Sequence, residues 1–204
     1  MRSVPDFYLE KNCGKKIIAG VDEAGRGPLC GPVVAGAVVF LKYDFDDMPL
    51  ISDSKQMNEK QREIAYDWIT NNKNIVWSVA QCSPAEIDEL NILRASLTAM
   101  KRAVNGLSLK PEYCLIDGNK MPDKIDGTAV VKGDAKSLSI AAASIVAKVT
   151  RDRLMYELSK QFPQYGWDKN AGYPTQQHLK AIEKYGVNEH YRKTFGPVKK
   201  ILEY

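Results

Sequence analysis

Short apolar runs separated by turn residues recur along the chain, and their lengths predict strands that are buried on both faces. Residues 16–21 and 32–41 form the first two runs, and the glycine-proline turn between them predicts an antiparallel pair. Similar runs predict three more strands, over 75–81, 113–116 and 128–131. The sequence therefore predicts a sheet of at least five strands.

Apolar residues at helical spacing alternate with these strands. Asn58, followed by Gln61 three positions later, is typical of a capping box, and Ser83 before Pro84 is a second helix start. The second helix is expected to end with Gly106 as a left-handed cap. Helices are expected over 59–71, 84–105, 138–161 and 176–185.

The order of these elements predicts an α/β fold, with a mixed sheet flanked by helices and parallel pairing wherever a helix connects two strands. No internal repeat or long linker interrupts the chain. We expect one domain over 1–204, with a core over about 16–160 and a helical or irregular C-terminal extension over about 161–204.

The composition is ordinary for a soluble protein, with 44% hydrophobic and 26% charged residues in 204. The longest apolar run is broken by Ser144 and Lys148, and no N-terminal segment has the pattern of a signal peptide. We therefore expect a cytoplasmic protein without membrane association. The four cysteines form no C-x-x-C pair and no histidine lies near them, which argues against zinc and against a disulfide framework.

The formal net charge of +4 permits a polyanionic partner without requiring one. Lysines and arginines are concentrated in the second half of the chain, where tyrosines are interleaved with them. This mixture is typical of nucleic-acid binding, because the cations neutralise phosphates and the rings stack on sugars or bases. An ordinary solvated helical surface is the alternative interpretation.

Acidic residues follow three of the predicted strands. Asp22 and Glu23 follow the first, Asp117 follows the run over 113–116, and Asp134 lies shortly after the strand over 128–131. Ligands of α/β sheets gather at the carboxyl ends of strands, so one shared site is more economical than three separate solvated loop starts. Carboxylates without histidine or cysteine suit Mg²⁺ or Mn²⁺, and two such ions catalyse phosphodiester hydrolysis.

Several motifs, in order, closely resemble the type 2 ribonucleases H, and within them the bacterial ribonuclease HII family. The resemblance extends over about residues 16–198 and is strongest at 21–33 (VDEAGRGPLCGPV), 52–55 (SDSK), 87–93 (IDELNIL), 115–118 (LIDG), 132–134 (KGD), 139–152 (SIAAASIVAKVTRD) and 172–175 (GYPT). It implies a ribonuclease H-like fold and a C-terminal part that helps to hold a duplex.

The resemblance also implies a reaction. It is metal-dependent cleavage of RNA in RNA–DNA hybrids and of duplex DNA that contains a single ribonucleotide, leaving 3′-hydroxyl and 5′-phosphate ends. Matched residue by residue, the family's four catalytic and metal-binding carboxylates correspond to Asp22, Glu23, Asp117 and Asp134.

The same resemblance assigns substrate contacts. The backbone of Gly25, Arg26 and Gly27 would meet the 2′-hydroxyl, the group that distinguishes RNA from DNA, and Tyr173 would pack on the neighbouring deoxyribose. A bare turn and an ordinary aromatic residue are the alternatives. Four further residues are expected to contact the substrate backbone, although an ordinary helix surface explains them almost as well: Lys55, Asn91, Ser144 and Lys148.

Three positions bear on how far the resemblance holds. Cys30 stands where alanine is common in the family, a change between small residues. Tyr191 occupies the place of a family histidine, with His190 beside it, so a role that depends on that histidine does not transfer. Arg151 and Asp152 are interpreted as an internal ion pair.

Two alternative functions stay open from the sequence. A type 3 ribonuclease H would cut RNA stretches but handle single ribonucleotides poorly. It usually has an additional N-terminal domain, whereas about 15 residues precede the first predicted strand here. A non-catalytic hybrid-binding module would use the same basic surface, although the four carboxylates argue against it. We expect the protein to act as a monomer.

Overall fold

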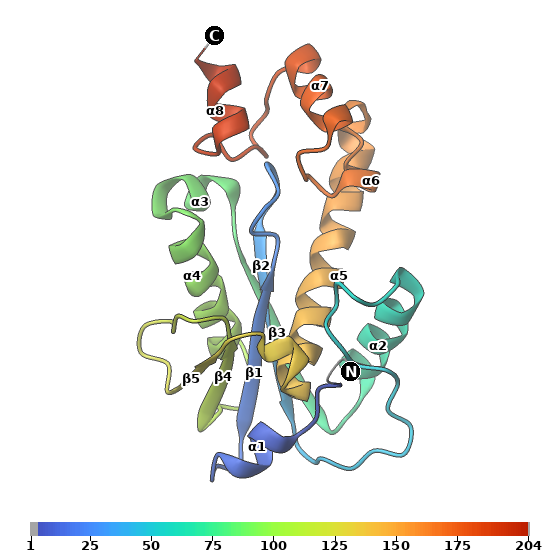
Figure 1. The fold of residues 1–204 in the computed structure, drawn as a ribbon, viewed down its shortest axis with the longest axis vertical. Helices are drawn as coiled ribbons and strands as arrows, with labels where there is room; N and C mark the ends of the chain where they lie inside the picture. The colour runs from blue at the N-terminus through green and yellow to red at the C-terminus, as the bar shows by residue number, and fades with distance from the viewer. Residues whose placement is uncertain (1–3, 204) are drawn as a thin grey trace.

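The computed structural model describes residues 4–203 and shows a mixed sheet with helices on both faces (Figure 1). The strands are β1 (Ile18–Ala24), β2 (Val33–Phe40), β3 (Ile75–Cys82), β4 (Tyr113–Asp117) and β5 (Gly127–Val130). The α-helices are α1 (Tyr8–Asn12), α2 (Glu59–Asn71), α3 (Pro84–Leu90), α4 (Ile92–Asn105), α5 (Leu138–Gln161), α6 (Trp167–Asn170), α7 (Gln176–Tyr185) and α8 (Gly196–Leu202). Two 3-10 turns complete the set, η1 (Gly133–Ala135) and η2 (Pro163–Tyr165).

The five strands lie in the order β3-β2-β1-β4-β5. β1, β2 and β3 are antiparallel neighbours, whereas β4 and β5 run parallel to β1. This confirms the predicted α/β fold, and the antiparallel β1–β2 pair is joined by the loop over residues 25–32. The expected parallel pairing across helices holds for β1 and β4. It is wrong for β2 and β3, which are antiparallel although α2 lies between them, and β4 and β5 are parallel without a helix in residues 118–126. The carboxyl ends of β1, β4 and β5 consequently lie at the same edge of the sheet.

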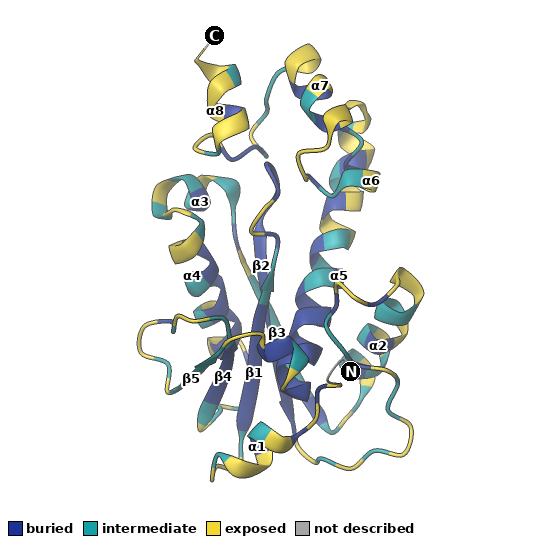
Figure 2. Cartoon of the chain, in the orientation of Figure 1, coloured by how far each residue is buried: buried dark blue, intermediate teal, exposed yellow. Residues whose placement is uncertain are grey.

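Helices cover the two faces of the sheet (Figure 1). α3 and α4 pack on one face, and α5 with α2 packs on the other. Residues 138–147 of α5 are all buried, and Figure 2 shows this part of the helix in dark blue, because its small and apolar residues face the sheet. Gly20 of β1 and Gly36 of β2 permit this close contact, since a Cβ at either position would lie within 2.5 Å of α5 backbone atoms.

β1 is longer than the sequence predicted. It continues to Ala24, so Asp22 and Glu23 lie within the strand rather than after it. The cause is the antiparallel partner, because β2 pairs with β1 up to Ala24 while the parallel pairing with β4 ends at Val21. The acidic pair is therefore fixed by a ladder of hydrogen bonds on one side and open on the other.

The helix expected over 84–105 is two helices. Asn91 breaks it with a positive φ of 65°, and its side chain accepts hydrogen bonds from the amides of Leu93 and Arg94 at the start of α4. Gly106 is not a left-handed cap, because its φ is −82°. Its small size is needed instead against Ser78 of β3, whose Oγ would lie 2.5 Å from a Cβ.

The region after α5 is more helical than predicted. α7 matches its predicted bounds, but α6, α8 and the N-terminal α1 are short helices without a long apolar period, so the pattern did not reveal them. α6, α7 and α8 lie together at one end of the molecule (Figure 1), around a cluster that includes Trp167, Ile182 and Val198.

Two expectations from composition can be compared with the structure. Within residues 4–203, no helix combines the length and the apolar character that crossing a bilayer requires. All four cysteines are free thiols, and Cys30, Cys82 and Cys114 are buried in the core.

Candidate active site

The strand register brings Asp22 and Asp117 to the same edge and face of the sheet. Val21 pairs with Ile116, so Asp22 and Asp117 are the next residues along two parallel strands. Val21 and Ile116 point into the core beneath α4, and alternation along a strand turns the next residues toward α5. Asp117 is in turn level with Val130, the last residue of β5.

Asp134 reaches the same place from η1, the turn between β5 and α5. The amide of Gly133 donates a hydrogen bond to Oδ1 of Asp117 at 2.6 Å, which fixes this turn against the end of β4. A Cβ on Gly133 would lie 2.6 Å from the end of the Ile140 side chain and 3.2 Å from Oδ1 of Asp117, so a larger residue would press on both neighbours. The backbone thus determines the position of Asp134 relative to Asp117.

These carboxylates are buried close to one another, so their negative charges lack both hydration and sufficient positive partners. Burial raises the pKa of Asp22 well above its ordinary value, and repulsion from Glu23 and Asp117 adds to it. Burial also raises the pKa of Glu23, although the charge of Arg26 opposes the shift. Burial also raises the pKa of Asp134, and repulsion from the negative charges of Asp53 and Asp117 raises it further. A nearby cation would relieve this cost.

Lys55 supplies a positive charge of the protein itself close to these carboxylates. Partial burial opposes its protonated form, but the carboxylates of Asp22, Asp134, Asp53 and Asp117 outweigh that effect and raise its pKa. One ammonium group therefore stands among four acids, and a net negative charge remains. Hard divalent cations prefer such oxygen donors, so the donor set fits Mg²⁺ or Mn²⁺ in its chemistry.

The carboxylates do not form a closed cage as they stand. Among residues 4–203, no three His, Cys, Asp or Glu side chains are arranged to hold a metal ion. Two of the carboxylates have partners within the protein: Oε1 of Glu23 accepts from Arg26 at 3.2 Å, and Oδ1 of Asp117 accepts from the Gly133 amide.

A small cavity of about 210 Å³ adjoins the acidic cluster and gathers most of the predicted substrate residues. Its lining includes Glu23, Gly25, Arg26, Gly27, Lys55, Lys148 and Tyr173. A Cβ on Gly27 would lie 3.4 Å from the Tyr173 ring, so the glycine turn and the tyrosine face each other across a narrow space. Tyr173 is 42% exposed, which leaves its ring accessible from this cavity.

The remaining predicted substrate residues have other observed contacts. Ser144 is buried, bonds with the hydroxyl of Ser54 at 2.7 Å and helps to stabilise the Asp22 carboxylate, so it offers no exposed group to a strand. Asn91 caps α4 and does not line the cavity. Lys148 forms an ion pair with Asp152 at 2.6 Å. The proposed pair of Arg151 with Asp152 is therefore wrong, because Asp152 faces the previous turn of α5.

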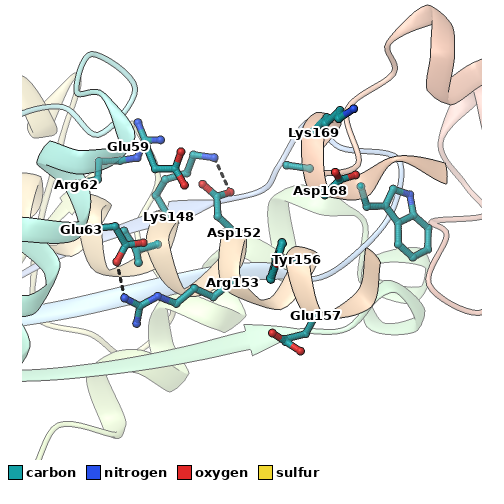
Figure 3. A pocket seen from close by; sticks show the side chains of 13 residues that line it. Glu59, Arg62, Glu63, Lys148, Asp152, Arg153, Tyr156, Glu157, Asp168 and Lys169 are labelled. Atoms are coloured by element: carbon teal, nitrogen blue, oxygen red, sulfur yellow. Dashed lines mark hydrogen bonds and ion pairs between the residues drawn. The ribbon is translucent and has the colours of Figure 1, made fainter. Parts of the chain in front are cut away.

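A second cavity of about 590 Å³ lies beyond Lys148, between α2, α5 and α6 (Figure 3). Its charges are mixed: five acids face four bases, and Figure 3 shows Lys148 with Asp152 and Arg153 with Glu63 as ion pairs. The charged lining residues are Glu59, Arg62, Glu63, Lys148, Asp152, Arg153, Glu157, Asp168 and Lys169. Because this lining has no excess of positive charge, it does not favour a polyanion, and the smaller cavity remains the candidate site.

Three residues near the site were missed from the sequence. Asp53 lies in the recognised 52–55 motif and adds negative charge beside Asp134. Arg192 and His178 are fully buried and bind backbone carbonyls. A charged or polar residue in a polar stretch is normally exposed, so the sequence offered no signal for these two. Arg151 is internal as expected, but it too binds backbone carbonyls rather than a carboxylate.

Comparisons with known proteins identify the family of this chain. The sequence profile of the family described as Ribonuclease HII matches residues 19–196. A ribonuclease HII from Magnetococcus marinus is 53% identical over 208 aligned positions, covering 97% of this chain and 95% of that protein.

Solved structures support the fold. The ribonuclease H2 of Pyrococcus horikoshii superposes with a TM-score of 0.73 at 31% identity, covering 92% of this chain and 97% of that one. A Bst ribonuclease HIII in complex with Mn²⁺ gives a TM-score of 0.74 at 18% identity, over 96% of this chain and 72% of that one, and supports the fold alone. The ribonuclease H-like fold is therefore confirmed, and the chain belongs to the ribonuclease HII family and is a ribonuclease H enzyme.

Proposed function

We propose that this enzyme cleaves the RNA strand of RNA–DNA hybrids and cuts duplex DNA on the 5′ side of single embedded ribonucleotides. The cut would leave a 3′-hydroxyl and a 5′-phosphate. The observation that carries the proposal is the small cavity, in which Glu23 shares one lining with Gly25–Gly27 and Tyr173. The turn that we assign to sugar recognition and a carboxylate that we assign to metal binding are thereby adjacent.

The chain's residues divide the work between cation binding and recognition. Asp22, Glu23, Asp117 and Asp134 would hold the divalent cations, since their charge is incompletely compensated. Such cations, when bound, supply an activated water and stabilise the leaving oxygen. Lys55 provides positive charge beside these carboxylates, where it would attract the phosphate backbone.

Recognition would come from other residues that line the cavity. Gly25, Arg26 and Gly27 present backbone without bulky side chains at Gly25 and Gly27, so a sugar edge can approach closely. The Tyr173 ring would pack against the next deoxyribose. Lys148, which also lines the cavity, would contact the strand, and the C-terminal extension over about 161–204 would help to hold the duplex.

The test is cleavage of labelled duplexes with one ribonucleotide or with several, in Mg²⁺ or Mn²⁺. Asp22→Asn and Asp134→Asn are expected to lose cleavage while keeping a cooperative unfolding transition. Asp46→Asn, which changes an exposed acid before α2, is the matched control and should cleave as the parent does. Full activity in either site variant would refute the assignment of the carboxylates.

The substrate panel also separates the alternatives. A type 3-like enzyme would nick the RNA stretch and leave the single ribonucleotide intact. A hybrid-binding module would bind both duplexes and nick neither in either metal ion. Cleavage of the single-ribonucleotide duplex at its 5′ side is the result that the proposal requires.

A further inference from the structure

Two buried arginines lie beside the glycine turn that the proposed function assigns to sugar recognition. Arg151 and Arg192 are 1% and 0% exposed, and among residues 4–203 no carboxylate forms an ion pair with either. Burying a charge without a counter-ion is costly unless hydrogen bonds replace its hydration. Both guanidiniums are accordingly directed at backbone carbonyls.

Arg192 makes the larger set of these bonds. Its Nη2 donates to the carbonyls of Gly25 at 2.6 Å and Gly31 at 2.9 Å. Nη1 donates to the carbonyls of Arg26 at 3.0 Å and Pro28 at 2.8 Å. Nε donates to the Gly31 carbonyl as well, at 3.0 Å. All five donors of the guanidinium are thus used on four carbonyls of the segment 25–31.

These bonds determine which way two amides point. In a planar trans peptide, the C=O of one residue and the N–H of the next are directed to opposite sides. The Gly25 and Arg26 carbonyls face Arg192, so the N–H groups of Arg26 and Gly27 face away from it. Gly25, Arg26 and Gly27 line the small cavity and Arg192 does not, which places the cavity on the side of the two amides.

Both amides are available to a ligand. Within the described chain, neither the Arg26 N–H nor the Gly27 N–H donates to a protein acceptor. The Tyr173 ring stands opposite Gly27 and is fixed to the same framework, because the Leu29 amide bonds the Gly172 carbonyl at 2.8 Å. Two free donors and an aromatic ring therefore bound one narrow space.

We propose that Arg192 is a positioning residue for ribonucleotide recognition: its guanidinium fixes the Gly25 and Arg26 peptides so that the Arg26 and Gly27 amides point into the cavity. This rests on the proposed function, in which the glycine turn meets the 2′-hydroxyl. The hydroxyl oxygen accepts from such amides, and deoxyribose has no corresponding atom. Lysine cannot replace Arg192, because one ammonium group has three donors and no planar fork.

The test compares affinities for two duplexes of one sequence, with and without a single ribonucleotide, by fluorescence anisotropy. Asp134→Asn serves as the parent, since it is expected to prevent cleavage. Adding Arg192→Lys should lower the preference for the ribonucleotide at least fivefold while the affinity for the all-DNA duplex changes less than twofold. Adding Arg102→Lys instead is the control, because Arg102 also donates to a carbonyl, that of Gln81 on β3, and does not line the cavity.

The outcomes separate a positioning role from a structural one. An unchanged preference in Arg192→Lys, including a parallel loss of affinity for both duplexes, would overturn the inference while leaving the proposed function intact. Absence of any preference in the parent would refute the proposed function and this inference together.

A second measurement does not depend on the folding of the variant. In the Asp134→Asn parent, the Arg26 and Gly27 amide resonances should shift more on binding the ribonucleotide duplex than on binding the all-DNA duplex. The Leu29 amide, which is already bonded to Gly172, serves as the internal control. Equal shifts of the Arg26 and Gly27 amides with the two duplexes would overturn the inference.

Discussion

Replacement of Gly20 by alanine tests the closest contact between the sheet and α5. Gly20 lies two residues before Asp22 on β1, and a Cβ there would be 2.1 Å from the Ser139 carbonyl carbon and 2.3 Å from the Ile140 nitrogen. Ordinary contact begins near 3.4 Å, so β1 and α5 must separate by about 1.3 Å. The obstacle is helix backbone, which cannot move aside as a side chain can.

The cost follows from this displacement. Overpacking a core costs typically about 1–3 kcal/mol, and a backbone obstacle places Gly20→Ala at the upper end of this range. Reduced freedom of the unfolded chain offsets about 0.4–1 kcal/mol. A net loss of about 2 kcal/mol lowers the Tm of a domain of this size by about 4–8 °C.

The same change should also reduce catalysis, because separating α5 from β1 moves the Asp134 turn away from Asp22. A misplacement of about 1 Å can cost about 10²-fold in rate. Calorimetry and steady-state cleavage of a single-ribonucleotide duplex measure the two effects. Gly196→Ala is the control, since no atom lies within 4 Å of a Cβ there. A Gly20→Ala Tm within about 1 °C of the parent would refute the close packing.

Two further predictions concern pH. Folding raises the pKa of Asp22, so the folded protein binds this proton more tightly than the unfolded chain does. The stability that results is fully present at a pH below the ordinary pKa of an aspartate, and it is lost as the pH rises through the pKa of Asp22 in the folded protein. With a chelator present, the free energy of unfolding of the parent should therefore fall relative to that of Asp22→Asn as the pH rises above about 4. Denaturant titrations measure both values, and an equal dependence on pH in the two proteins would contradict this prediction. His178 behaves in the opposite sense, because burial lowers its pKa while its Nε2 accepts from Trp167 and Tyr191. The protein should therefore lose stability as the pH falls below about 6.5, the ordinary pKa of histidine. His178→Phe should remove that pH dependence and cost about 1–3 kcal/mol for each buried partner left unpaired. An unchanged pH profile of Tm in that variant would contradict the prediction.

Much of the fold and the carboxylate set could be predicted from the sequence. The capping box at Asn58, the limits of α5 and the five strands follow from local patterns that act within a few residues. The Asp22, Asp117 and Asp134 positions followed from one further rule, that parallel strands end at one edge of the sheet. Short helices such as α6 and the break at Asn91 did not follow, because too few residues carry their pattern.

The sequence by itself determined which residues are chemically able to act and the order of the elements that bear them. Only the tertiary structure decided how they are supported. The extension of β1 to Ala24 depends on pairing with β2, and the burial of Arg192 depends on a C-terminal segment that returns beneath residues 25–31. The Arg192 contacts join residues more than 160 positions apart. A local pattern reports the preference of a residue, whereas its burial and partners exist only once the chain has folded.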